Sequence, residues 1–344
     1  MAALLSSHIT ANAVVGLLLL GALWVARFVR RNRLWRDAFT QIARRRPLAL
    51  AVCALYVSLG LIDSVAWIGG GDTGGDAVAS HQPRSLLDRA FGTSRERSYS
   101  APLARAEFYG QRPLAHPGKH LLGTDVLGRD VLFVTLKGAR IALLIGGLTS
   151  LISIPLALFF GVLAGYFGKW LDDAIFFLMS VLASVPGILL LIALIMALGK
   201  STLSVCLALG VTGWVGFCRI ARGEAMKLRE LDYVHAARAL GVPEVRIILR
   251  HILPNLIHLI VITFVLTFSS QVLSEAVLSW INIGVDGSWG QMIAQAKDEL
   301  ARDPIVWWNI AGAGGGLFGL LLAINMVGDA VRDVLDPRTS KENL

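Results

Sequence analysis

The chain has 344 residues, of which 55% are hydrophobic and only 16% are charged, and its mean hydropathy is +0.64. A soluble domain carries about a quarter of charged residues, so this composition excludes an ordinary soluble protein and indicates a polytopic membrane protein. The net charge of +8 would suggest nucleic acid in a soluble protein, but the topology of a membrane protein accounts for much of it and no nucleic-acid partner is expected.

Long apolar runs predict about seven membrane-spanning helices, because a bilayer core needs roughly 20 apolar residues per helix. These runs are too long for the strands of a barrel and show no alternation of apolar and polar residues. The expected fold class is therefore all-α, a polytopic transmembrane helical bundle. The predicted spans are residues 11–28, 48–68, 141–166, 174–198, 202–221, 255–279 and 307–328.

The positive charges predict the orientation of these helices. From Arg27, at the end of the first span, to the start of the second span, eight arginines stand against Asp37 alone, so the positive-inside rule places this segment in the cytoplasm. The connection between the third and fourth spans fits less well, because Asp172 and Asp173 outweigh Lys169. The expected outer segments are the N-terminus, 69–140, 199–201 and 280–306, and the expected inner segments are 29–47, 167–173, 222–254 and the C-terminus.

A polar, basic stretch from Asp232 to Asn255 separates two apolar spans. The alanines before Gly241 favour a helix, and Gly241 stands where that helix would end in a left-handed cap. Pro243 suits the first turn of a second helix, and Pro254 marks the join to the next span. The sequence predicts a helix–glycine–helix arrangement, and a solvated connector is the alternative.

The same stretch is similar to the cytoplasmic coupling loop of bacterial ABC importer permeases, whose pattern is Glu-Ala-Ala, three residues, Gly and, further on, Leu-Pro. His235 stands at the acidic position and departs from the pattern. The peptide-importing branch has Asp/Glu-Tyr before this pattern and Arg-His-x-Leu-Pro-Asn at its end. The matching residues are Asp232, Tyr233, Ala236, Ala237, Gly241, Arg250, His251, Leu253, Pro254 and Asn255.

Two further blocks resemble the dipeptide/oligopeptide permeases. Before the third span, HLLGTDVLGRD is similar to the family form HPLGTDxxGRD, with Leu121 in place of the usual proline. From the residues alone, the glycines of this block predict turns, and Asp130 suits the cap of the following helix. A block from Val327 to Arg338 resembles the family's C-terminal ending. The motif residues before the third span are Gly123, Thr124, Asp125, Gly128, Arg129 and Asp130.

The resemblance covers about residues 120–338 and implies a six-helix type I ABC importer permease, here with one extra N-terminal helix. It implies four parts of the chain. These are 1–47 with the extra transmembrane helix and a basic cytoplasmic linker, 48–140 with the first permease helix and a periplasmic segment, 141–330 with the core permease domain and its coupling loop 222–254, and 331–344 as a cytoplasmic tail.

The resemblance also implies a function and a set of partners. The chain would be a non-catalytic subunit that imports di- and oligopeptides across a bacterial inner membrane. It would work with a second homologous permease, two cytoplasmic ATPases that bind ATP and Mg²⁺, an extracytoplasmic peptide-binding protein and the lipid bilayer. No cofactor is expected in this chain. Arg238 and Arg246 are the expected charged contacts with an ATPase.

Other functions stay open as alternatives. Permeases of this branch share motifs across cargoes, so nickel chelates, glutathione or antimicrobial peptides are alternative substrates. A secondary transporter would need central intramembrane acids and inverted repeats, of which the sequence offers little. A membrane enzyme would need a catalytic constellation on one side of the membrane, and none is evident.

Glu275 is the notable charge inside an apolar span. Such groups are costly and often functional, so Glu275 is a candidate gate or pathway residue, with a structural role as the alternative. Substrate-binding residues stay unassigned. The seven histidines lack metal-ligand spacing and the three cysteines lack paired spacing, so no metal site and no disulfide are expected.

Small residues and tryptophans complete the set of predictions. Gly161 with Gly165, and Gly312 with Gly316, have the spacing that lets membrane helices touch; whether they face a partner or the chain's own helices stays open. The tryptophans of the last outer loop are expected to anchor the chain at the membrane interface. They are Trp289, Trp307 and Trp308.

Overall fold

The computed structural model describes residues 27, 40–41, 43–64, 66–67, 84–91, 96–107 and 112–335. Apart from Arg27, the predicted span 11–28 lies outside the described residues. The chain forms two compact units, Met1–Leu143 with Asp286–Ala323 and Leu144–Val285 with Ile324–Leu344. Each unit is described by itself.

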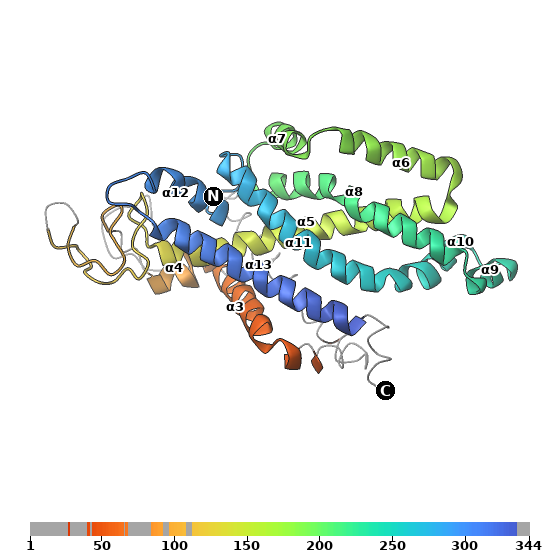
Figure 1. Ribbon diagram of the computed structural model, residues 1–344, viewed down its shortest axis with the longest axis horizontal. Coiled ribbons are helices and arrows are strands. Elements are labelled where there is room, and N and C mark those ends of the chain that lie inside the picture. Colours follow the sequence, from red (N-terminus) through yellow and green to blue (C-terminus); the bar gives the residue numbers. More distant parts are fainter. Residues whose placement is uncertain are drawn as a thin grey trace. The chain divides into compact units, whose positions relative to one another are not determined.

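The first unit contains α3, a short antiparallel pair of strands, α4, the start of α5, α12 and the start of α13 (Figure 1). The bounds of these elements are α3 Pro47–Ser64, β1 Ala66–Trp67, β2 Arg84–Ser85, α4 Leu86–Phe91, α5 Val131–Phe167, α12 Trp289–Glu299 and α13 Trp308–Leu335.

The second unit contains the rest of α5 and a series of helices that ends in α11, together with the end of α13. Figure 1 shows α9 and α10 at the end of α8 and α11 that lies away from α7. The bounds are α6 Lys169–Ser184, α7 Gly187–Leu198, α8 Thr202–Arg229, α9 Asp232–Ala239, α10 Glu244–Ile247, the π turn η1 Ile248–Ile252, the 3-10 turn η2 Leu253–Leu256 and α11 Ile257–Trp280.

Five helical stretches of the described chain are long and apolar enough to cross a membrane. They are Pro47–Ser64, Val131–Phe167, Thr202–Arg229, Glu244–Trp280 and Trp308–Val334. The prediction of an all-α transmembrane fold is confirmed, and each stretch contains most or all of one predicted span. The helices are mostly longer than the apolar runs, since a helix continues beyond the bilayer until a cap or a turn ends it.

The predicted span over 174–198 is sharply bent and does not form one straight helix. α6 and α7 meet at an angle of 89°, as Figure 1 shows, and form a sixth span only if the bent pair is counted as one. Val185 is extended at the break, with φ −90° and ψ 131°. Pro186 explains the break, because a proline has no N–H for the helix and disfavours helical geometry in the residue before it.

The two pairs of closely spaced glycines pack against the chain's own helices. A Cβ on Gly165 of α5 would lie 2.4 Å from the carbonyl oxygen of Arg222 on α8, and a Cβ on Gly161 would lie 2.8 Å from that of Cys218. On α13, a Cβ on Gly316 would lie 2.8 Å from the ring of Trp289. The α5–α8 contact is thus backbone against backbone, which only glycine permits at this distance.

Two of the three tryptophans expected at the membrane interface are buried instead. Trp289 is 2% exposed and its Nε1 donates to the carbonyl of Thr135 at 2.8 Å. Trp308 is 3% exposed and donates to the carbonyl of Thr124 at 2.9 Å. A buried indole N–H needs such an acceptor, so both rings are structural, and Trp307 alone of the three is exposed.

Gly165→Leu tests the α5–α8 contact. The new side chain would meet backbone that cannot move aside, so we expect a loss of about 1–3 kcal/mol of stability. Thermal unfolding of the detergent-solubilised protein, followed by tryptophan fluorescence, measures it. Gly216→Ala is the control, since nothing lies within 4 Å of its Cβ position, and it should unfold no earlier than the wild type. An unchanged midpoint for Gly165→Leu would contradict the contact.

Candidate functional site

The α9–α10 connection is closed by a left-handed glycine. Gly241 has φ +75°. Its N–H donates to the carbonyl of Arg238 at 3.0 Å, and that of Val242 donates to the carbonyl of Ala237 at 3.1 Å. These are the two bonds of a Schellman cap. The predicted helix–glycine–helix arrangement is confirmed, although Pro243 lies just before α10 and not within its first turn.

The polar stretch is more helical than the predicted loop 222–254. α8 continues to Arg229, and the chain is helical again from Glu244 onward. Pro254 does not separate a loop from a span, because it lies within helical turns that lead directly into α11. Its missing N–H accounts for the widened turn η1 and the tightened turn η2 around it. α10, η1, η2 and α11 therefore form one helical run of 37 residues.

The inner face of this region anchors it to α5 and α8. Its apolar side chains are at most 7% exposed and pack against the ends of those two helices. A set of buried contacts like this moves together with the helices that it joins. The contributing residues are Val234, Ala237, Ile247, Ile252 and Leu256 from the loop, and Val162, Tyr166 and Ala225 from α5 and α8.

A polar triad adds a second attachment between α5, α9 and α10. The Tyr166 hydroxyl donates to Oε2 of Glu244. Arg238 donates to Oε1 of Glu244 and to the Tyr166 hydroxyl, each at 3.2 Å, and its guanidinium lies 5.5 Å from the centre of the Tyr166 ring. The hydrogen bond to Tyr166 raises the pKa of Arg238 above its already high ordinary value, so Arg238 carries its charge within the Tyr166–Arg238–Glu244 triad.

The acidic residue that opposed the predicted orientation is neutralised. Asp172 of α6 accepts two hydrogen bonds from Arg222 of α8, at 2.5 and 2.7 Å. Arg229 donates to the carbonyl of Gly165 at 3.0 Å. Both acidic and basic side chains line a cavity of about 460 Å³ beside the triad. This corner is therefore polar but balanced in charge.

The outer face of the α9–α10 region is apolar and basic. Leu240 is 83% exposed, Val245 65% and Leu249 60%, and Arg246 is exposed without a partner among the described residues. An open hollow of about 510 Å³ lies on this face. Its lining residues are Pro243, Val245, Arg246, Leu249, Arg250 and Pro254.

The structure brings some residues of the coupling-loop motif, Asp232 to Asn255, into contact and leaves others apart. Asn255 donates to the Tyr233 hydroxyl at 3.3 Å and to the carbonyl of His251 at 2.6 Å. His235 and Ala236 are exposed, and Leu253 is half-buried. The apolar residues of the outer face were missed in the sequence. Their helical spacing, opposite the buried positions, was the signal that could have found them.

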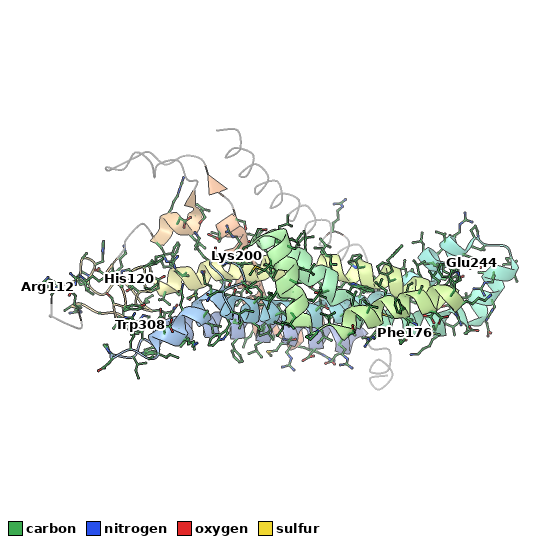
Figure 2. The ribbon with its side chains drawn as sticks, turned by 90° about the horizontal axis from the view of Figure 1, so that it is seen from above. Arg112, His120, Phe176, Lys200, Glu244 and Trp308 are labelled. Carbon is green, nitrogen blue, oxygen red and sulfur yellow. The ribbon has the colours of Figure 1, made fainter. Side chains whose placement is uncertain are left out.

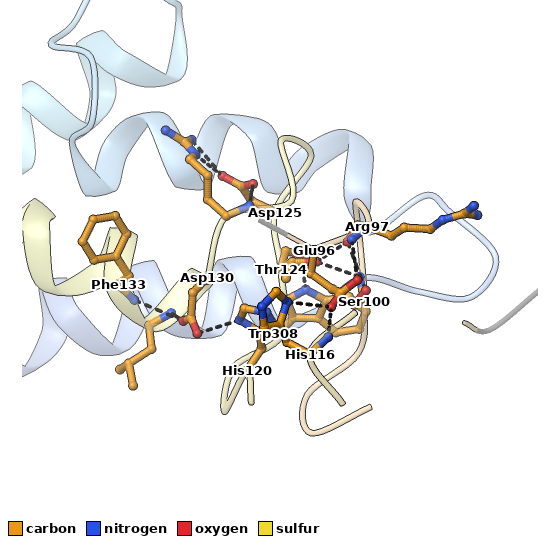
Figure 3. Close-up of polar contacts among 12 residues, drawn as sticks. Glu96, Arg97, Ser100, His116, His120, Thr124, Asp125, Asp130, Phe133 and Trp308 are labelled. Carbon is orange, nitrogen blue, oxygen red and sulfur yellow. Dashed lines mark hydrogen bonds and ion pairs between the residues drawn. The ribbon is translucent and has the colours of Figure 1, made fainter. Parts of the chain in front are cut away.

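The second motif lies in the segment before α5, described over residues 96–107 and 112–130 and called here the pre-α5 segment (Figure 3). Gly123 and Gly128 have φ of +67° and +71°. A Cβ on Gly123 would lie 2.5 Å from the carbonyl oxygen of Ser100, and one on Gly128 would lie 1.9 Å from that of Glu96. The predicted turns are confirmed, and each requires glycine for close approach as well as for φ.

The acids of this motif hold the pre-α5 segment together. Asp125 accepts from the backbone N–H of Leu127 and Arg129 at 2.8 and 2.9 Å, and from Arg129 Nε at 2.8 Å. Asp130 accepts from the N–H of Leu132 at 2.8 Å and binds His120 Nδ1 at 2.8 Å. Asp130 is thus the predicted cap of α5. Thr124 and Asp125 are buried, so the motif shapes the segment from inside.

Glu275 is 3% exposed within α11. Its carboxylate accepts from the Ser279 hydroxyl at 2.5 Å and from the N–H of Val285 at 3.3 Å. The side chain therefore holds the turn that follows α11 against the helix. The described residues contain no group of three His, Cys, Asp or Glu side chains that could hold a metal ion.

Glu299, at the end of α12, is an unusual buried acid. It is 1% exposed, and neither its carboxylate oxygens nor Oδ1 of the nearby Asn309 has a hydrogen-bond donor among the described residues. Burial raises the pKa of Glu299, and the charges of Asp125 and Asp298 act in the same direction, whereas the nearby Asn309 side chain and the charge of Arg302 act in the opposite one.

Glu299→Gln should remove a pH-dependent loss of stability. The folded chain holds this proton to a higher pH than the unfolded chain does, so its stability falls as the pH rises from the ordinary glutamate pKa through the raised one. We expect the variant to match the wild type at pH 4 and to exceed it by about 1 kcal/mol at pH 8. Thermal unfolding across this range measures the difference, and Asp329→Asn, at an exposed acid of α13, should keep the wild-type profile. Parallel profiles for Glu299→Gln and wild type would argue against a buried titrating group.

Comparison with known proteins identifies the family. The description "Binding-protein-dependent transport system inner membrane component" matches residues 157–341, which is more than half of the chain. A protein of Brucella abortus that is named a peptide transport system permease is 39% identical over 231 residues, covering 66% of this chain and 76% of that protein.

Two further relatives show the range of names within the family. The oligopeptide transport system permease protein OppC of Bacillus subtilis is 33% identical over 225 residues, covering 64% of this chain and 73% of its own length. The glutathione transport system permease protein GsiD of Pectobacterium atrosepticum is 34% identical over 224 residues, with 64% and 73% covered. The chain belongs to the family of binding-protein-dependent transport system inner membrane components, and it is a multi-pass permease subunit of a bacterial inner membrane.

Proposed function

We propose that this chain is the permease subunit of an ATP-driven ABC importer for di- and oligopeptides. The proposal is supported by relatives whose names specify peptide or oligopeptide transport. The chain would form the translocation path with a second homologous permease and receive its cargo from an extracytoplasmic peptide-binding protein. Two cytoplasmic ABC ATPases would bind ATP and Mg²⁺, and this chain would catalyse no reaction itself.

We place the α9–α10 region and the C-terminus in the cytoplasm, and the N-terminus and the pre-α5 segment outside. The eight arginines before the second predicted span support this orientation through the positive-inside rule. The pairing of Asp172 with Arg222 neutralises one of the two acids that argued against it. The molecule would then present its exposed apolar and basic loop face to the ATPases.

The observation that carries the proposal is the two-sided build of the α9–α10 region. Its inner face is fixed to α5 and α8 by buried apolar contacts and the triad. Its outer face exposes Leu240, Val245 and Leu249. Among the described residues, this region is packed on one face and has an exposed apolar face on the other, so a protein bound to the exposed face could transmit its movement to α5 and α8. Closure of the ATPases would move α9, and the helical run from α10 into α11 would carry the motion into the membrane.

The remaining candidate residues receive roles consistent with their contacts. Arg246 is exposed and is our choice for a charged contact with the ATPase, whereas Arg238 would act chiefly within the triad. The buried motif around Asp125 would position the pre-α5 segment. Glu275, which holds the turn after α11, would gate the path by releasing that turn in one of two packings of the helices.

The first experiment is to purify the tagged chain from its native membrane together with whatever co-purifies, and to measure ATP hydrolysis. Stimulation of hydrolysis by a peptide-loaded binding protein supports the proposal. Stimulation by glutathione and not by peptides would favour glutathione as the cargo, the second candidate, which is suggested by a relative named a glutathione transport permease. An intact preparation without ATPase subunits or activity would overturn the proposal in favour of a gradient-driven carrier.

Gly241→Pro should uncouple ATP hydrolysis from uptake. Proline cannot adopt a positive φ and lacks the N–H that caps α9, at a cost of about 3 kcal/mol. A cost of this size lowers the population of correctly placed α9 about a hundredfold. Peptide uptake and ATP hydrolysis in proteoliposomes are measured together, with Gly223→Ala as the control because its Cβ position is open. Normal uptake per ATP in Gly241→Pro would count against a coupling role.

Leu240→Asp should weaken binding of the ATPase subunits without disturbing the fold. Burial of one leucine side chain contributes about 2 kcal/mol, so its replacement should weaken the complex about thirtyfold. Retention of the ATPase subunits on the immobilised chain is the measurement. Leu127→Asp, at a site 60% exposed in the pre-α5 segment, is the matched control and should leave retention unchanged. Equal retention in both variants would remove Leu240 from the interface.

A further inference from the structure

The pre-α5 segment keeps its acidic side chains inside. Glu96 accepts from the backbone N–H of His116 at 2.7 Å and is 3% exposed. Glu107 is 14% exposed and pairs with Arg97 at 2.9 Å. Asp125 and Asp130, whose contacts were given above, are 3% and 13% exposed. All four described acids of the segment are therefore used within it, and none of them presents a free negative charge.

The basic side chains of the same segment point the other way. Arg105, Arg112 and Lys119 are exposed. None of the three side chains has a hydrogen bond or ion pair within the described part of the chain. With the acids turned inward, the charge that the described segment presents outward is positive.

These three residues belong to one hairpin. Gly118 N–H donates to the carbonyl of Ala104 at 2.8 Å, and Leu103 N–H donates to that of His120 at 2.8 Å. An antiparallel bridge joins Ala106 to Pro113. The two arms, residues 103–107 and 112–121, are called here the basic hairpin. Each arm also exposes one leucine, Leu103 at 54% and Leu121 at 58%.

The basic hairpin extends away from the membrane-length helices of its own unit. Figure 2 shows Arg112 beyond His120 and Trp308, on the side away from α5 and α13. Beside Arg112 is an open hollow of about 640 Å³. A position beyond the helix ends favours a soluble partner over a lipid headgroup. The hollow is lined by Glu96, Arg97, Glu107, Arg112, Pro113, Leu114 and Ala115.

The hairpin is also held in place before any partner arrives. The left-handed turns at Gly123 and Gly128 and the buried carboxylates fix its base. A fixed surface loses little conformational freedom on binding. Unpaired, like-signed charges around exposed leucines are suited to steer an oppositely charged protein surface and then to exclude water from the contact.

We infer that the basic hairpin is a docking surface for an acidic face of the extracytoplasmic binding protein. The inference rests on the proposed function, since it assumes that such a protein delivers the cargo. Carboxylates of the binding protein pair with Arg105, Arg112 and Lys119. Opposite charges speed the encounter, and the leucines add apolar contact.

Charge reversal tests the docking surface. The wild-type transporter in nanodiscs, R105E/R112E/K119E, and the charge-keeping R105K/R112K/K119R are compared for association with the co-purifying binding protein by surface plasmon resonance. We expect association of the reversed variant to be slower by about tenfold or more at low salt, with the difference shrinking at high salt. The charge-keeping variant should match the wild type. None of the three side chains has a hydrogen bond or ion pair among the described residues, so basal ATP hydrolysis should be the same in all three proteins.

A zero-length carbodiimide crosslink identifies the contact directly. This reagent joins an amine to a carboxylate that touches it, so Lys119 should be joined to an Asp or Glu of the binding protein, as read by mass spectrometry, and K119R should remove that crosslink. Equal association of the reversed variant would overturn the inference while leaving the importer intact. If the charge-reversed variant lost binding to phosphatidylglycerol vesicles but kept its binding to the binding protein, the docking inference would be overturned in favour of a lipid-binding surface. Absence of any co-purifying ATPase would overturn the proposed function itself.

Discussion

Backbone N–H and C=O groups at the end of a helix have no partners within that helix. In this protein, the hydrogen bonds that satisfy these groups fix the positions of the segments around α9 and before α5. Gly241 closes α9 through two backbone bonds, Asp130 closes the start of α5, and the glycines of the pre-α5 segment let its turns approach carbonyl groups within contact distance. Both family-like motifs consist largely of such closing residues.

The attachment of the α9–α10 region combines two kinds of interaction with different physical properties. Buried apolar side chains provide most of its stability, while the Tyr166–Arg238–Glu244 triad restricts the orientation of α9 and α10 relative to α5. Arg238 and Glu244 are each more than 40% exposed, so the ion pair by itself contributes little. Its value lies in geometry, since a planar guanidinium that bonds two groups and covers an aromatic ring permits few arrangements. A region attached in this way can tilt as a body but cannot easily slide.

The sequence was sufficient for the elements whose cause is local. Apolar length predicted the membrane helices, and Gly241 and Asp130 predicted their own caps, because capping depends on a few neighbouring residues. The bend at Pro186 was missed because a long apolar run conceals one proline. The burial of Trp289 and Trp308 was missed because their acceptors, the carbonyls of Thr135 and Thr124, are far away in the sequence. Arg238 was expected to face a partner, and its internal bonds could be found only once Tyr166 lay beside it.

The unbroken passage from α10 into α11 has a mechanical consequence. At 1.5 Å per residue, its 37 residues form a rod about 55 Å long. A rod of that length converts a small rotation into a large displacement, so a tilt of about 5° at one end moves the other by about 5 Å. The far end is Trp280, directly after the turn of helix that carries Glu275 and Ser279. A movement too small to disturb the packing around α9 is therefore large enough, at the opposite end, to break a hydrogen bond.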